Sequence, residues 1–170
     1  KTREGGVMRL ENLIADIDEE MFTKIVENRS VRDKDARDTA KIVGLAAIKY
    51  GDLSNQATKD YIFDVDRFTS FEGNTGPYIL YTIVRIKSIL NRYVEAGGNL
   101  EAGEILPASN GSEKNLMLQL SGFGSMIESA FEEKAPHKIC AYIYEVSNAF
   151  NSFYHETKIL SEENQAQKES

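Results

Sequence analysis

In Phe71-Glu72-Gly73-Asn74-Thr75-Gly76-Pro77-Tyr78, turn residues lead directly into a long apolar repeat. Thr75 can cap a helix, because its side-chain oxygen can accept a hydrogen bond from a backbone N–H of the first turn. Pro77 fits that turn, where its missing N–H has no intrahelical partner. The predicted helix ends at Gly97 and Gly98, and its apolar stripe consists of Ile79, Ile83, Ile86, Leu90 and Tyr93.

This helix is a positive strip within an acidic chain. The formal net charge of −7 argues by itself against a nucleic-acid-binding protein, because such domains usually carry a basic face. Between Gly76 and Val94, however, the charged residues are Arg85, Lys87 and Arg92, without any acidic residue. The net charge therefore does not decide the sign of this local surface.

Two helices are predicted before this stretch, and the connection after them has two interpretations. Apolar residues recur at helical spacing over Leu10–Val26. A second helix is expected over about Asp35–Tyr50, because Gly51 and Asp52 supply a stop. In the connection, the alternation of Tyr61, Phe63 and Val65 is typical of a short strand, but a turn of helix near Val65–Thr69 stays equally open.

Two further helices are predicted after the glycine pair. One covers residues 113–133 and is weakened by Gly122 and Gly124. The other opens at Pro136, and its apolar stripe consists of Ile139, Ile143, Val146, Phe150 and Phe153. Because apolar stripes on long helices bury each other, the predicted fold is all-α, a bundle of about five main helices in one domain.

Residues that would mark other protein classes are scarce. Cys140 is the only cysteine, which excludes an intrachain disulfide, and its apolar helical setting predicts a small buried side chain. His137 and His155 have no partner at ligand spacing, so we expect no metal site. No apolar run approaches the roughly 20 residues of a membrane span, and no catalytic constellation is legible.

Tyr78, Tyr81 and Arg85 share one face of the predicted helix, at offsets of three and four residues. Two aromatic rings and a guanidinium on one face suit unpaired bases, which stack on aromatic side chains and on arginine. On chemistry alone, ordinary surface packing is the commoner explanation of such a group. Tyr154 follows the stripe residue Phe153, so it either covers the edge of the core or offers a ring to a ligand.

The chain resembles the C-terminal region of arginyl-tRNA synthetases over nearly its whole length. The resemblance is carried by Tyr61-Ile62-Phe63-Asp64-Val65-Asp66-Arg67, by Ser70 through Tyr78, by Tyr81 and Arg85, and by Phe150 through Tyr154. In that family this region is a helical anticodon-binding domain of a class I aminoacyl-tRNA synthetase. The resemblance implies the same fold and the same role in tRNA binding here.

The resemblance also implies which side chains meet the tRNA. The expected anticodon-binding residues are Tyr78, Tyr81, Arg85 and Tyr154. The candidate phosphate contacts are Lys87, Arg92 and Lys158. Where some relatives carry a further aromatic residue, this chain has Lys158, which can meet a phosphate but cannot stack. The turn Asn74-Thr75-Gly76-Pro77 is expected to be structural, because its glycines permit backbone conformations that other residues resist.

We further expect the chain to be a fragment of a larger enzyme. Residues 1–9 resemble the remnant of the class I signature loop that ends the catalytic domain, in which Lys1-Thr2-Arg3 would touch ATP phosphates. Residues 10–170 would be the anticodon-binding domain without its C-terminal helix. The implied parent is a cytoplasmic arginine–tRNA ligase that uses ATP with magnesium, and this fragment would hold no catalytic residue and no cofactor of its own.

The implied partners are an arginine tRNA and the catalytic domain of the parent chain, with no role for DNA or a membrane. Two other functions stay open. The helices could dock a protein partner, as an interaction module, or the chain could be the equivalent domain of another class I aminoacyl-tRNA synthetase. The run from Glu72 to Tyr78 favours arginine over other synthetases, and salt dependence of binding separates RNA from protein partners.

Overall fold

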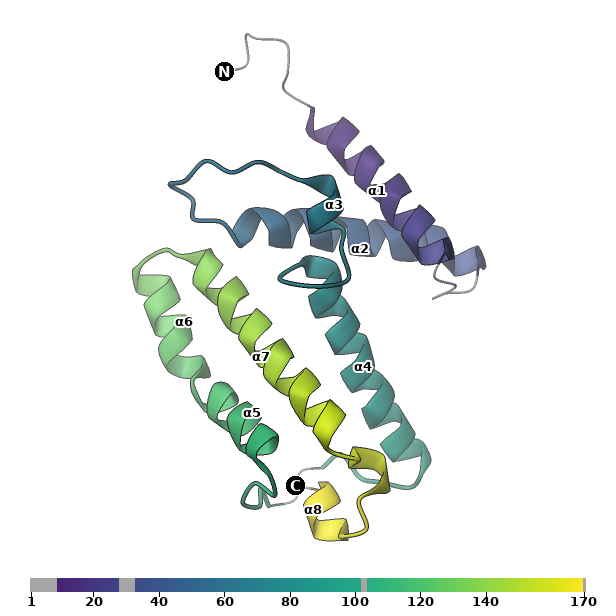
Figure 1. Cartoon of the computed structure of the whole chain (residues 1–170), viewed down its shortest axis with the longest axis vertical. Helices are drawn as coiled ribbons and strands as arrows, with labels where there is room; N and C mark the ends of the chain where they lie inside the picture. Colours follow the sequence, from purple (N-terminus) through teal and green to yellow (C-terminus); the bar gives the residue numbers. More distant parts are fainter. Residues whose placement is uncertain (1–8, 28–32, 102–103, 170) are drawn as a thin grey trace. The chain divides into compact units, whose positions relative to one another are not determined.

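The computed structural model describes residues 9–27, 33–101 and 104–169, and these contain helices and connecting segments without a β-strand (Figure 1). The all-α prediction is therefore confirmed. The chain divides into two compact units, Lys1–Leu80 and Tyr81–Ser170. The long helix α4, Gly76–Glu95, begins in the first unit and continues into the second.

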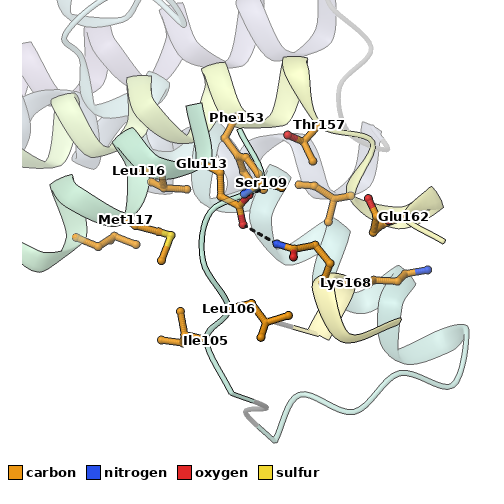
Figure 2. A pocket seen from close by; sticks show the side chains of 13 residues that line it. Ile105, Leu106, Ser109, Glu113, Leu116, Met117, Phe153, Thr157, Glu162 and Lys168 are labelled. Atoms are coloured by element: carbon orange, nitrogen blue, oxygen red, sulfur yellow. Dashed lines mark hydrogen bonds between the residues drawn. The ribbon is translucent and has the colours of Figure 1, made fainter. Parts of the chain in front are cut away.

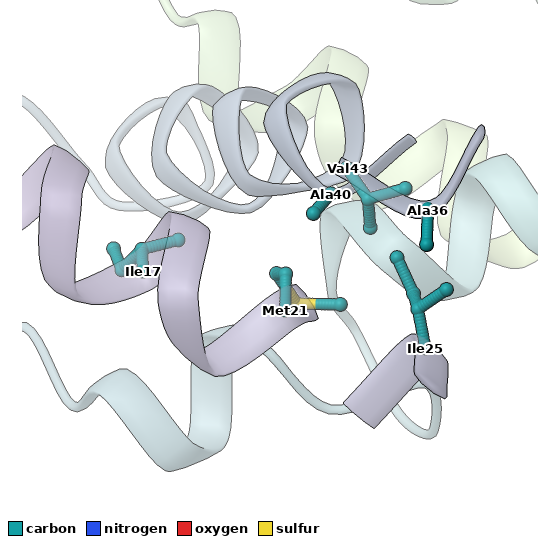
Figure 3. Close-up of a cluster of buried hydrophobic side chains, with 6 residues drawn as sticks. All are labelled: Ile17, Met21, Ile25, Ala36, Ala40 and Val43. Atoms are coloured by element: carbon teal, nitrogen blue, oxygen red, sulfur yellow. The ribbon is translucent and has the colours of Figure 1, made fainter. Parts of the chain in front are cut away.

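The core of the first unit lies between α1, Leu10–Glu27, and α2, Asp33–Leu53. Both helices were predicted within a few residues. The side chains that face each other are shown in Figure 3 and are Ile17, Met21 and Ile25 on α1 and Ala36, Ala40 and Val43 on α2. Bulky side chains on α1 thus pack against mostly small ones on α2, which lets the two helices approach closely.

Gly51 does not end α2, contrary to the prediction, because the helix continues to Leu53. A Cβ atom at Gly51 would lie 2.6 Å from the ring of Phe68, which returns to this point from a later segment. The glycine is needed for close approach between a helix and a buried ring. The sequence predicted a helix end here because a glycine directly after an apolar repeat is a common stop signal.

The connection before α4 contains a short helix, α3, Val65–Phe68, which confirms the helical interpretation of this segment over the strand. Asp64 caps it, since the carboxylate Oδ1 accepts a hydrogen bond from the Arg67 N–H at 3.0 Å. Phe68 is buried, and its ring centre lies 4.4 Å from that of Phe63. The alternation at Tyr61, Phe63 and Val65 therefore reflects an extended lead-in whose aromatic side chains pack on α3.

The turn that precedes α4 is fixed by side-chain hydrogen bonds. Thr75 Oγ1 accepts from the Tyr78 N–H at 3.2 Å, as the predicted cap requires, and donates to the Ser70 carbonyl at 2.6 Å. Asn74 Oδ1 accepts from the Tyr50 hydroxyl at 2.6 Å, which ties the turn to α2. The structural role predicted for this turn agrees with these bonds.

The two glycines of the turn serve different purposes. Gly73 has φ +78°, in the left-handed region, so its backbone freedom is used as predicted. Gly76 is required for a different reason, because a Cβ atom there would lie 2.3 Å from the carbonyl oxygen of Ala46 on α2. The start of α4 therefore rests against the backbone of α2.

The second unit is built around α7, Pro136–Glu156, which packs along α5, Gly111–Ser121, and α6, Phe123–Glu132. The predicted single helix over residues 113–133 is thus divided, and the break falls at Gly122. Asn110 caps α5, and the Tyr142 hydroxyl donates to the Gln119 carbonyl at 2.9 Å. Cys140 is buried on α7, as predicted.

The ends of α4 and α7 lead into short segments. Gly97, with φ +90°, terminates α4, and the Gly98 N–H donates back to the Tyr93 carbonyl at 2.9 Å. After α7 come a 3₁₀ turn, Ile159–Ser161, and the short helix α8, Gln165–Glu169. Across the parts of the chain that are described, no helix combines the length and apolar character needed to cross a membrane.

Candidate nucleic-acid interface

The second unit brings three of the predicted site residues together on two helices. The guanidinium carbon of Arg85, on α4, lies 4.8 Å from the ring centre of Tyr81 and 4.9 Å from that of Tyr154, on α7. Arg85 Nη2 also donates to the Tyr81 hydroxyl at 3.1 Å. We call Tyr81, Arg85 and Tyr154 the tyrosine–arginine cluster.

Both rings of the cluster remain accessible. Tyr81 is 50% exposed and Tyr154 is 37% exposed, whereas the Arg85 side chain between them is half-buried. The Tyr154 ring centre lies 6.2 Å from that of Phe150 at an interplanar angle of 24°, so this neighbouring ring of α7 packs against one side of Tyr154. Two supported aromatic rings with outward surface can stack on unpaired bases.

Arg85 keeps its positive charge without compensation from a carboxylate among the described residues. Its attraction to the two rings is of the cation–π type, which leaves the formal charge available to an approaching phosphate or base. The guanidinium can therefore donate charge-assisted hydrogen bonds to an anionic partner.

Asn151 is a member of this site that sequence reasoning missed. Its Oδ1 accepts from Arg85 Nη1 at 2.5 Å, and its Nδ2 donates to Thr82 Oγ1 at 3.3 Å. Asn151 lies three residues before Tyr154, on the same face of α7, and this spacing was the only indication in the sequence that it belongs to the site. Recognising it required knowing that this face meets α4.

Tyr78 lies in the first unit, in the first turn of α4, and is half-buried. Its backbone N–H donates to Thr75 Oγ1, so the cap fixes where its side chain leaves the helix. The contacts that define the tyrosine–arginine cluster all lie in the second unit and do not include Tyr78. Its predicted contact with RNA stays a prediction.

The candidate phosphate contacts lie on exposed parts of the second unit. Lys87 and Arg92 line one shallow hollow of about 380 Å³ on the surface of α4, together with Val84, Ser88, Asn91 and Glu95. Neither cation forms an ion pair with a described residue. Lys158 is exposed just after α7. Lys1, Thr2 and Arg3 lie outside the described residues.

A second hollow, of about 330 Å³, lies near the ends of α5 and α7 and is mainly apolar (Figure 2). Its apolar lining includes Leu116, Met117 and Phe153. The one lysine that lines it, Lys168, donates to the Leu160 carbonyl at 2.8 Å. Two carboxylates, Glu113 and Glu162, also line this cavity, so it does not suit an anionic nucleotide as the tyrosine–arginine cluster does.

The chain is similar to arginine–tRNA ligases over its whole length. The arginine–tRNA ligase of Agathobacter rectalis is 65% identical over 178 residues, which cover 100% of this chain and 30% of that protein. The arginine–tRNA ligase of Alkaliphilus oremlandii is 54% identical over 162 residues, covering 95% of this chain and 27% of that protein. The chain therefore spans less than a third of these curated relatives.

Solved structures agree on the fold. Arginyl-tRNA synthetase from Plasmodium falciparum matches with a TM-score of 0.81 and 28% identity, over 95% of this chain and 29% of that one. Thermus thermophilus arginyl-tRNA synthetase matches with a TM-score of 0.81 over 96% of this chain and 28% of that one, and its 23% identity makes this a likeness of fold.

Family models divide the chain in two. Residues 1–65 match the model described as tRNA synthetases class I (R), catalytic domain. Residues 79–170, which include α4 to α8 and the whole tyrosine–arginine cluster, match the model of the DALR anticodon binding domain. Since this second match covers more than half of its residues, the chain belongs to the DALR anticodon-binding domain family.

Proposed function

We propose that this chain recognises the anticodon loop of an arginine tRNA within an arginine–tRNA ligase. The observation that carries the proposal is the tyrosine–arginine cluster, which lies inside the part of the chain that matches an anticodon-binding domain. Relatives named arginine–tRNA ligase support arginine as the amino acid.

The cluster would bind bases and the surrounding cations would bind the backbone. Unpaired loop bases would stack on the outward surfaces of Tyr81 and Tyr154, since every base has a π face. Arg85 would donate hydrogen bonds to a base edge or a phosphate. Lys87, Arg92 and Lys158 would neutralise phosphates, and Tyr78, in the first unit, would offer a further ring to the RNA. This division accounts for a local cationic surface on an acidic chain.

The parent protein would carry out the chemistry elsewhere. It would activate arginine with ATP and magnesium and transfer the arginine to the 3′ end of the tRNA, in the cytoplasm. Residues 1–9, including Lys1, Thr2 and Arg3, would be the end of the signature loop within the part that matches the catalytic-domain model, and residues 79–170 would form the anticodon-binding domain. The chain by itself would then transfer no arginine, and arginylation by the purified chain would contradict this assignment.

Binding to RNA stem-loops tests the proposal. The chain is titrated with a labelled anticodon stem-loop of an arginine tRNA and with the same stem carrying a scrambled loop, at low and at moderate salt. The proposal predicts a preference for the native loop and weaker binding of both RNAs as salt rises, because phosphate contacts release counterions. Equal affinity for both loops would contradict it. Stem-loops of other tRNAs then test whether arginine is the cognate amino acid.

A second candidate function, docking of a protein partner, is favoured by the exposed apolar side chains of α5 and α6. Leu118 is 61% exposed and Phe131 is 83% exposed. Such side chains can form part of a protein interface. This surface carries neither Tyr81 nor Arg85, so the two functions predict effects of different variants and opposite sensitivity to salt.

A further inference from the structure

The guanidinium of Arg85 is held by an amide on another helix. Asn151, on α7, accepts from Arg85 Nη1 at 2.5 Å and donates through Nδ2 to Thr82 Oγ1 at 3.3 Å. Thr82 is only 2% exposed, and Asn151 is half-buried. The amide therefore connects an interior hydroxyl of α4 to the cation at the surface of the cluster.

The orientation of the Asn151 amide follows from the chemistry of its neighbours. Arginine has only donors, so the atom that faces Arg85 must be the amide oxygen. The NH₂ group then faces Thr82, whose hydroxyl oxygen accepts. Both ends of the amide are satisfied in this one orientation, and reversing it would place N–H groups against N–H groups.

This arrangement fixes a side chain that is otherwise flexible. An arginine has many rotamers in solution, and an interaction that restricts it in advance lowers the ordering cost at the moment of binding. Hydrogen bonds among the described residues use two of the five N–H groups, one to Asn151 and one to Tyr81. The remaining donors of Arg85 point in directions that the amide sets.

We propose that Asn151 is a positioning residue that orients Arg85 for selective contact with a loop base, an inference that rests on the proposed anticodon-loop function. Attraction between a cation and phosphates depends little on direction, whereas hydrogen bonding to a base edge depends on it strongly. Loss of Asn151 therefore removes the preference for the native loop, and it leaves the binding of any RNA through phosphates intact.

Three variants separate positioning from packing. Asn151→Leu keeps the branched shape of the side chain but removes both hydrogen bonds. Asn151→Asp keeps the acceptor for Arg85, and its added negative charge weakens the binding of both RNAs alike. Asn115→Leu makes the same change on the exposed surface of α5 and serves as the matched control. Thermal unfolding of each variant shows which of them fold like the wild type.

The readout is the ratio of affinities for the native and scrambled stem-loops. We expect Asn151→Leu to reduce this ratio to within about twofold of unity, with the affinity for the scrambled loop unchanged. Asn151→Asp and Asn115→Leu retain the wild-type ratio. A wild-type ratio in Asn151→Leu, with the protein folded, overturns the inference. A wild type that prefers neither loop overturns the proposed function itself.

A measurement without RNA decides the positioning directly. With ¹⁵N-labelled arginine, restricted rotation about the Nε–Cζ bond of Arg85 gives separate Nη1 and Nη2 signals. We expect separate signals in the wild type and Asn151→Asp, and one averaged signal in Asn151→Leu. Separate Arg85 signals that persist in Asn151→Leu would overturn the proposal whatever the RNA measurements give.

Discussion

The guanidinium carbon of Arg85 lies 4.9 Å from the ring centre of Tyr154, so a cation of α4 covers an aromatic face of α7. The two residues lie 69 positions apart in the sequence and belong to the same compact unit. Arg85 contacts Tyr81 in the same way, which links three polar side chains into one partly exposed group. This group is therefore a partly exposed surface that α4 and α7 hold in place.

Removal of a ring from this group should lower the affinity for RNA strongly and change the stability of the fold only slightly. Base–aromatic stacking contributes about 1–3 kcal/mol per base, so Tyr81→Ala and Tyr154→Ala should each lower the affinity for the native stem-loop roughly 5- to 150-fold. The half-exposed Tyr81 ring predicts only a small change in unfolding midpoint. Phe131→Ala removes an exposed ring from α6 and is the control, with unchanged RNA affinity. Unfolding of Tyr81→Ala would place its ring in the core and refute the site.

The cations beside the hollow on α4 should contribute to affinity without selectivity. Lys87→Gln and Arg92→Gln should each lower the magnitude of the slope of log K against log salt by about 0.7–0.9, the value for one phosphate contact. Lys114→Gln, on exposed α5, should leave the slope unchanged. The preference between loops should survive all three changes. A slope unaffected by both α4 variants would mean that their side chains meet no phosphate.

Gly76→Ala should destabilise the first unit. The added Cβ would lie 2.3 Å from the Ala46 carbonyl oxygen, so helix and turn must shift, at a cost of about 1–3 kcal/mol. Gly111→Ala is the matched control, because nothing lies within 4 Å of the added Cβ there. Urea unfolding compares the two. Equal free energies of unfolding for both variants would show that α4 does not rest against α2 as described.

Tyr61 should make the fold sensitive to alkaline pH. Burial, followed by the hydrogen bond to Asp52 and that carboxylate's charge, raises the pKa of Tyr61 to about 12. Because an unfolded tyrosine has a pKa near 10, the neutral phenol stabilises the fold fully below about pH 10, and this contribution disappears as pH rises through about 12. Folding stability therefore decreases with rising pH between about 10 and 12, as expected for a group whose pKa is higher in the folded state than in the unfolded state.

The difference in absorbance at 295 nm between wild type and Tyr61→Phe isolates this one phenol among eight tyrosines. We expect its titration to be centred near pH 12 and to move toward pH 10 in Asp52→Asn. A difference curve already centred near pH 10 in the wild type would show that the hydrogen bond from Tyr61 to Asp52 does not persist in solution.

The sequence predicted the elements whose signals are local. The apolar repeat of α1, the Thr75 cap of α4 and the Pro136 start of α7 depend on residues within a few positions of one another. The predicted helix over residues 113–133 is divided at Gly122, because glycine weakens a helix. Whether such a weakened helix actually breaks depends on how its two halves pack against α7. Gly51 was misread as a stop because its contact with Phe68 is not local.

The same distinction applies to the site. Tyr81 and Arg85 could be paired from helical spacing, since four residues make about one turn. Tyr154 could be placed beside them only through the family resemblance, because no local pattern joins α7 to α4. Asn151 was missed altogether, since its role exists only where Arg85 and Thr82 meet it. Physical contact across helices is the information that one-dimensional spacing lacks.

Photo-cross-linking tests most directly whether this surface meets the loop. A 5-iodouridine placed in the anticodon loop of an arginine tRNA stem-loop is irradiated in complex with the chain, and the cross-linked peptide is identified by mass spectrometry. We expect adducts on Tyr81 or Tyr154, suppressed by an excess of unlabelled native loop but not of scrambled loop. Adducts confined to α5 and α6, or equal suppression by both competitors, would contradict it.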